Sequence, residues 1–92
     1  MKNKQIRKAI YFFAPLWDSK SIYKLNKFID ACERISLRYE CVDVDTIDGT
    51  KLSIKYGVRN VPCAILLSKD KKVVSIEKGN DIHNTLLDKY EN

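Results

Sequence analysis

The stretch Tyr56-Gly57-Val58-Arg59-Asn60-Val61-Pro62 lies at the boundary between two sequence patterns. A polar segment, residues 45–56, precedes it and carries the spaced apolar residues of a short helix. Gly57 suits the left-handed backbone conformation that follows a helix C-terminus. From Val61 to Leu67 the chain is continuously apolar around Pro62, as in a buried strand. We therefore predict a helix, a turn at Gly57 and a strand.

Downstream of this stretch, the pattern indicates a hairpin and a last helix. The polar triplet Lys69-Asp70-Lys71 interrupts the apolar run before Val73, Val74 and Ile76, which is typical of a β-hairpin. After Gly79, either Asn80 or Asp81 is suited to cap a helix. Its expected apolar face consists of Ile82, Leu86, Leu87 and Tyr90.

Upstream, the pattern predicts a strand, a helix and a second strand. Residues 9–14 are continuously apolar, as in a central strand covered on both faces, and Pro15 ends the run. Tyr39 to Val44 alternates as a second strand, with Val42 and Val44 on one face. Between them, from Ser19 to about Ser36, helical spacing predicts an apolar face, with Asp18, Ser19 or Ser21 as its cap. That face comprises Ile22, Leu25, Phe28, Ile29, Cys32 and Ile35.

The predicted order is β-α-β-α-β-β-α in one domain that spans residues 1–92. A right-handed crossover makes the first two strands parallel, and the short turn near Asp70 makes the last two antiparallel. The expected class is α/β, a mixed four-stranded sheet flanked by three helices. With 92 residues and 45% apolar side chains, the chain is long enough to bury a core without a metal or disulfides.

Composition points to a soluble, intracellular protein. No apolar run approaches the roughly 20 residues of a transmembrane helix, and the opening Met1 to Lys8 lacks a signal-peptide cleavage pattern. We therefore expect no membrane partner. Cys32, Cys41 and Cys63 match neither a disulfide framework nor a zinc signature, which favours reduced thiols in the cytoplasm.

The net charge of +5 and the pI near 9.2 suit acidic partners or nucleic acid. The basic residues are scattered, apart from two small groups that we interpret as a solvated chain end and a charged turn. These groups are Lys2, Lys4, Arg7 and Lys8, and then Lys69, Lys71 and Lys72. A basic nucleic-acid accessory protein is thus a secondary alternative, since no binding motif accompanies the charge.

No cofactor or metal is expected. His83 is alone on the polar side of the last helix, and we interpret it as a surface residue. Asp43, Asp45 and Asp48 lack the glycine and glutamate spacing of a calcium loop, which favours capping roles.

Three segments resemble the thioredoxin family: Tyr11 to Trp17, Val42 to Asp45, and Tyr56 to Pro62. Gly79 stands where the family places a glycine before its last helix. The resemblance covers Ile6 to Tyr90 and implies a minimal thioredoxin-like fold without the extra N-terminal strand and helix. It also implies a cis peptide bond before Pro62, next to the backbone edge at which the family binds extended substrates.

The family's paired cysteines are missing. Its Trp-Cys-x-x-Cys motif corresponds here to Trp17-Asp18-Ser19-Lys20-Ser21. If Trp17 is aligned with the tryptophan of the motif, Asp18 and Ser21 take the two cysteine places. If the alignment is shifted by one residue, Trp17 and Lys20 take them. Neither register supplies a thiol, and disulfide exchange requires a sulfur-sulfur intermediate. Tyr11 and Cys41 likewise replace an aspartate and a lysine that assist proton transfer in the family.

The resemblance therefore implies a redox-inactive module that binds a protein or extended peptide. The expected surface is the loop from Trp17 to Ser21 with the Val61-Pro62 edge, where Trp17 forms either an apolar rim or part of the core. The alternative is a residual thiol-disulfide oxidoreductase or isomerase that uses Cys63, although its apolar neighbours predict burial. Cys32 and Cys41 are expected to be small core residues.

Overall fold

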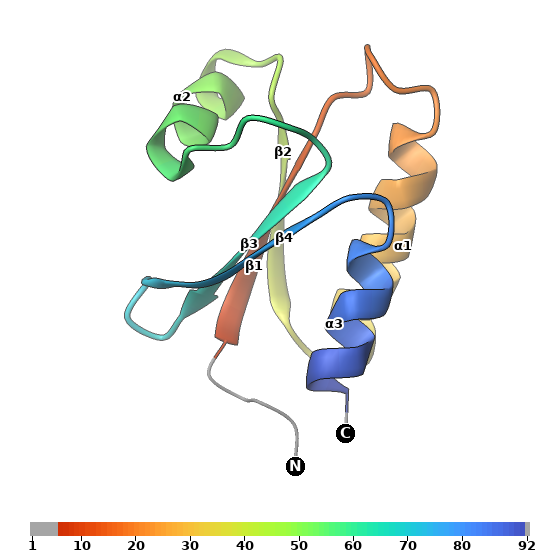
Figure 1. Cartoon of the computed structure of the whole chain (residues 1–92), viewed down its shortest axis with the longest axis vertical. Coiled ribbons are helices and arrows are strands. Elements are labelled where there is room, and N and C mark those ends of the chain that lie inside the picture. The colour runs from red at the N-terminus through yellow and green to blue at the C-terminus, as the bar shows by residue number, and fades with distance from the viewer. Residues whose placement is uncertain (1–5, 92) are drawn as a thin grey trace.

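A computed structural model describes residues 6–91 of the chain (Figure 1). The seven elements follow the predicted order, and the α/β class is confirmed. They are β1 (Ile6–Phe13), α1 (Ser21–Arg34), β2 (Arg38–Asp43), α2 (Ile47–Tyr56), β3 (Cys63–Ser68), β4 (Val73–Lys78) and α3 (Ile82–Tyr90).

The four strands form one mixed sheet in the order β2-β1-β3-β4. The β1-β2 pair is parallel, because α1 connects the two strands as a crossover. The β1-β3 and β3-β4 pairs are antiparallel, as the hairpin pattern predicted for the last two strands. The two apolar strands β1 and β3 are thus central, whereas β2 and β4 are the edges.

The helices cover both faces of the sheet, with α1 and α3 side by side on one face and α2 on the other (Figure 1). Each face has its own buried cluster, because side chains alternate along β1 and β3. The first cluster, on the α1-α3 face, is centred on Tyr11, Phe28, Leu66 and Leu86. The second, on the α2 face, comprises Ile10, Phe12, Val42, Cys63, Ile65 and Leu67.

The start of α1 differs from its prediction. The helix begins at Ser21 rather than Ser19, Lys20 is its N-cap, and no side chain caps it. Ile22 is 52% exposed instead of buried. The buried face of the helix contains Ser21, Phe28 and Cys32. Because successive helical residues are rotated by about 100°, Ile22 points away from the face that contains Ser21.

The other helix ends follow the sequence more closely. The Thr46 hydroxyl caps α2 by accepting a hydrogen bond from the Gly49 amide at 2.9 Å. Gly57 has a φ of 67° and ends α2 in the left-handed conformation, as predicted. Asp81 is the N-cap of α3, but its side chain makes no capping hydrogen bond. Among residues 6–91 there is no helix long and apolar enough to cross a membrane.

Candidate functional site

The loop between β1 and α1 is held by its own backbone. The amides of Trp17 and Asp18 both donate to the Ala14 carbonyl, at 3.1 and 3.2 Å. The Ser21 amide then donates to the Asp18 carbonyl at 3.0 Å, which starts the first turn of α1. Pro15 contributes to the tightness of the loop because its ring fixes φ. The loop therefore presents residues 16–20 in a defined conformation.

Four of the predicted site residues line one small recess beside this loop. Asp18 and Ser21 come from the loop and the start of α1, and Val61 and Pro62 come from the segment before β3. Tyr11, Phe13, Ala14 and Lys24 complete the lining. The tertiary structure thus brings together two segments that are 40 residues apart in sequence. Trp17, Ser19, Lys20 and Cys63 are not part of this lining.

The Asp18 carboxylate is fully engaged at the start of α1. One oxygen accepts a hydrogen bond from the Lys20 amide at 2.9 Å, and the other forms an ion pair with Lys24 Nζ at 2.6 Å. The hydrogen bond from Lys24, followed by the one from the Lys20 amide, lowers the pKa of Asp18 below its ordinary value. Asp18 is therefore a carboxylate at neutral pH and cannot donate a proton there.

Ser21 is 3% exposed, and its hydroxyl has no hydrogen-bond partner among residues 6–91. It faces the recess together with Asp18, whereas the side chains of Trp17 and Lys20 are exposed. The hydrogen bond from the Ser21 amide to the Asp18 carbonyl forms a turn that joins the two residues. Of the two residue pairs that the sequence left open, Asp18 with Ser21 lines the recess, and Trp17 with Lys20 does not.

Tyr11 forms the back of the recess. Its ring stacks on Phe28 with centroids 4.4 Å apart, and burial, followed by the nearby Cys41 and Asp18, raises the pKa of Tyr11 to about 12. Cys41 is its register partner on β2, and burial also raises the pKa of that thiol. Both groups are therefore neutral at pH 7, so this pair holds neither a carboxylate base nor an ammonium ion.

Trp17 lies on the surface, with 80% of its side chain exposed. Its indole Nε1 donates to Asp45 Oδ1 at 3.2 Å, which connects the loop to the turn after β2. Leu16 beside it is exposed to a similar extent. The alternative in which Trp17 is part of the core is therefore wrong. Trp17 contacts the β2-α2 turn and does not line the recess.

The segment before β3 leaves backbone groups unused. The Val61–Pro62 peptide bond is cis, and Val61 is 36% exposed. Within residues 6–91, no hydrogen bond engages the amide or carbonyl of Val61, whereas the Pro62 carbonyl accepts from the Gly79 amide at 3.4 Å. The Val61 amide and the Val61 carbonyl beside the recess are thus a free hydrogen-bond donor and a free hydrogen-bond acceptor.

Cys63 lies on the opposite face of the sheet from Tyr11. It is 2% exposed and belongs to the cluster that faces α2. Burial raises the pKa of its thiol above the ordinary value, and Lys78 offsets only part of this effect. Cys63 therefore remains a neutral thiol at pH 7 and does not face the recess.

The other two cysteines differ in burial. Cys32 is fully buried on the inner face of α1, and this burial raises its pKa to about 12. The prediction that Cys41 is a core residue is wrong, because β2 is an edge strand and leaves its side chain partly exposed.

Within the described residues there is no group of three histidine, cysteine, aspartate or glutamate side chains that could hold a metal ion. Asp43, the last residue of β2, acts in the turn that follows this strand. The carboxylate of Asp43 accepts a hydrogen bond from the Asp45 amide at 2.9 Å. His83 is partly buried on α3.

Comparison with known proteins places this architecture among thioredoxin-like folds. The structure matches thioredoxin from Fasciola hepatica with a TM-score of 0.73 and 22% identity, over 94% of this chain and 83% of that one. It matches oxidised thioredoxin from Plasmodium falciparum with a TM-score of 0.73 and 18% identity, over 92% of this chain and 81% of that one. It matches thioredoxin 1 from Thermosipho africanus with a TM-score of 0.69 and 22% identity, over 86% of this chain and 89% of that one. No family model and no curated protein matches the sequence.

At these identities the likeness describes the fold alone. The chain has a thioredoxin-like fold, with neither Asp18 nor Ser21 supplying a thiol in the loop that follows β1.

Proposed function

We propose that this chain is a non-catalytic module that binds a protein or an extended peptide at the recess. The binding surface comprises the loop from Trp17 to Ser21 and the Val61-Pro62 edge. The observation that carries the proposal is the free amide and carbonyl of Val61, which border a recess beside an exposed apolar loop.

The free main-chain groups suit β-augmentation. An extended peptide that pairs with Val61 gains two hydrogen bonds without competing with the sheet of the module itself. Such pairing is independent of peptide sequence, so side-chain contacts have to supply specificity. Trp17 and Leu16 are suited to this role because large apolar side chains are enriched at the centres of protein interfaces.

The absence of redox chemistry is part of this proposal. Asp18 is bound to Lys24 and the Lys20 amide, and Ser21 is buried, so neither is an exposed nucleophile. Neither an oxygen nucleophile nor a carboxylate can form the mixed disulfide on which thiol exchange depends. We place the protein in the cytoplasm, where its three free cysteines would stay reduced.

The test is a selection of extended peptides from a random displayed library, followed by titration of the selected peptides against variants. Trp17→Ala should weaken binding by about tenfold or more, as expected for an aromatic anchor, and Val61→Ala should weaken it less because the backbone remains. Ile54→Ala is the matched control, because Ile54 is 75% exposed on α2 and lies outside the recess. The Val61 amide resonance should move when peptide binds. Unchanged affinity in both the Trp17 and the Val61 variant would remove this surface from consideration.

A further inference from the structure

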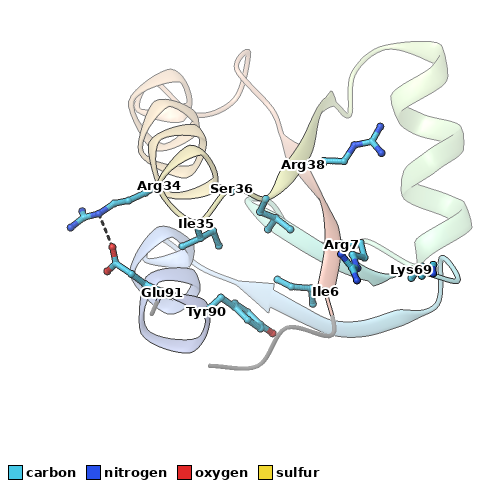
Figure 2. Close-up of a pocket in the computed structure, with 10 residues that line it drawn as sticks. Ile6, Arg7, Arg34, Ile35, Ser36, Arg38, Lys69, Tyr90 and Glu91 are labelled. Carbon is cyan, nitrogen blue, oxygen red and sulfur yellow. Dashed lines mark ion pairs between the residues drawn. The ribbon is translucent and has the colours of Figure 1, made fainter. Parts of the chain in front are cut away.

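A second concave surface lies at the other end of the sheet, where β1 begins. The recess described above adjoins the last residues of β1, whereas this groove is lined by Ile6 and Arg7 at its start (Figure 2). The nearest lining residues on β1, Arg7 of the groove and Tyr11 of the recess, are four residues apart, which is roughly 13 Å at about 3.3 Å per residue. The groove is therefore separate from the proposed peptide site.

Strand register brings three cationic residues to this groove. Lys8 is the partner of Arg38 on β2, and Ile6 is the partner of Ser68 on β3. Arg7 precedes Lys8 on β1, and Lys69 follows Ser68 in the turn after β3. Arg7, Arg38 and Lys69 therefore come from β1, β2 and that turn, and all three line the groove. Figure 2 shows them on the side of the groove that is away from α1 and α3.

Among residues 6–91, no side chain neutralises Arg7, Arg38 or Lys69 by an ion pair. Arg34, at the far side of the groove, forms an ion pair with Glu91 at 2.8 Å. Arg7, Arg38 and Lys69 are all exposed, and like charges that line one groove attract an anion strongly.

The chemistry of the lining selects the kind of anion. Two guanidinium groups favour planar, bidentate binding of phosphate oxygens, and a lysine adds a point charge. Several cations around one groove suit several linked phosphates better than one. The groove also has apolar side chains, Ile6 and Ile35, and the Tyr90 ring extends toward the start of β1 (Figure 2).

We propose that this groove binds a polyphosphate group, either as a free polyphosphate anion or as part of a nucleotide. A single strand of nucleic acid is a poorer fit, because such strands need a longer track of cations and exposed aromatic rings for base stacking. Tyr90 is the aromatic residue of the groove, and its ring is largely buried.

The experiment titrates the full chain with tripolyphosphate, with ATP and with an oligomer of ten thymidines, by calorimetry at 150 mM NaCl without divalent cations. Tripolyphosphate and ATP should each bind with a stoichiometry of one. Equal affinity assigns the groove to free polyphosphate, and tighter binding of ATP assigns it to a nucleotide. Failure of both to bind, or binding of the oligomer alone, would overturn the proposal.

Variants locate the binding. Arg7→Gln with Arg38→Gln should weaken binding of tripolyphosphate by at least about tenfold, the usual effect of losing hydrogen bonds to a charged group. Lys51→Gln with Arg59→Gln removes the same charge outside the groove and should change affinity by less than about threefold. Equal losses in both double variants would mean attraction to net charge and would contradict a site. In the unmodified chain, the amide resonances of residues 6, 7, 37, 38 and 69 should shift on titration, which is independent of variant folding.

Discussion

At the residue scale, Asp18 has a structural role at the start of α1. Its carboxylate accepts from the Lys20 amide and pairs with Lys24, one turn into α1. Both partners favour the charged form, which lowers the pKa of Asp18 in the folded chain. Its contribution to stability is therefore present above the unfolded pKa and is lost as pH falls through the lower, folded pKa.

Asp18→Asn should lower the midpoint of thermal unfolding at pH 6 to 7, and the difference from the unmodified chain should narrow toward pH 2. The effect should be modest, because the ion pair is partly exposed and screened. Asp30→Asn is the control, because it removes one negative charge from the exposed surface of α1. A difference in unfolding midpoint between Asp18→Asn and the unmodified chain that stayed constant from pH 7 to pH 2 would contradict this role for the Asp18 charge.

Cys63 provides the residue-scale test of the enzymatic alternative. We expect insulin-disulfide reduction with dithiothreitol to proceed at the reagent's own rate, both with the unmodified chain and with Cys63→Ser. The raised pKa should also leave Cys63 unreactive toward alkylating reagents at neutral pH until the chain is denatured. The serine variant should lose about 1–3 kcal/mol of stability, since it buries a hydroxyl among apolar side chains. Turnover that depended on Cys63 would refute the non-catalytic proposal.

At the element scale, the turn at the start of α1 allows the assignment of the former cysteine places to be tested. Asp18→Cys with Ser21→Cys puts two thiols on the recess, one of them next to Lys24 and the helix N-terminus, which both lower a thiol pKa. This variant should form an internal disulfide on oxidation, detected by mass, and reduce insulin faster than dithiothreitol alone. Trp17→Cys with Lys20→Cys is the matched control, and it should form less internal disulfide and reduce insulin more slowly. If the control variant instead exceeded the Asp18 and Ser21 variant in both readouts, the alignment that puts Trp17 and Lys20 in the cysteine places would be favoured.

The junction between β2 and α2 depends on Gly49. A Cβ atom at this position would lie 1.9 Å from the Asp43 carbonyl oxygen, a backbone atom. Gly49→Ala should therefore destabilise the fold by about 1–3 kcal/mol or more, through a forced shift of the first turn of α2. Urea unfolding measures the loss, and Lys51→Ala on the exposed side of the same helix should change stability little. Full stability in the Gly49 variant would be inconsistent with this close approach.

At the scale of the whole molecule, the two buried clusters share the central strands β1 and β3. This sharing predicts one cooperative unfolding transition for a single domain. Leu86→Ala should remove about 2–5 kcal/mol, because Leu86 is fully buried between α3 and the sheet. Far-ultraviolet and near-ultraviolet circular dichroism should report the same shifted midpoint in urea. Two separate transitions would argue against the single-domain prediction for residues 1–92.

Local signals accounted for most of the fold. Apolar runs gave β1 and β3, helical spacing gave α1 and α3, and Gly57 ended α2 as expected. The errors were at the start of α1 and in the burial of Ile22 and Cys41. Lys20 occupies the N-cap although Asp18, Ser19 and Ser21 have better capping side chains, because the backbone bonds of the preceding loop set where α1 begins.

The sequence by itself determined the element order, the mixed sheet and the absence of a cysteine pair after β1, because these depend on periodicity, turn length and residue type within short windows. The tertiary structure decided that Trp17 is exposed, that Cys63 lies on the face away from the recess, and that Arg7, Arg38 and Lys69 share one groove. These outcomes depend on strand register and on which face of the sheet a residue occupies. Both arise from pairing between segments far apart in the chain, which local patterns do not specify.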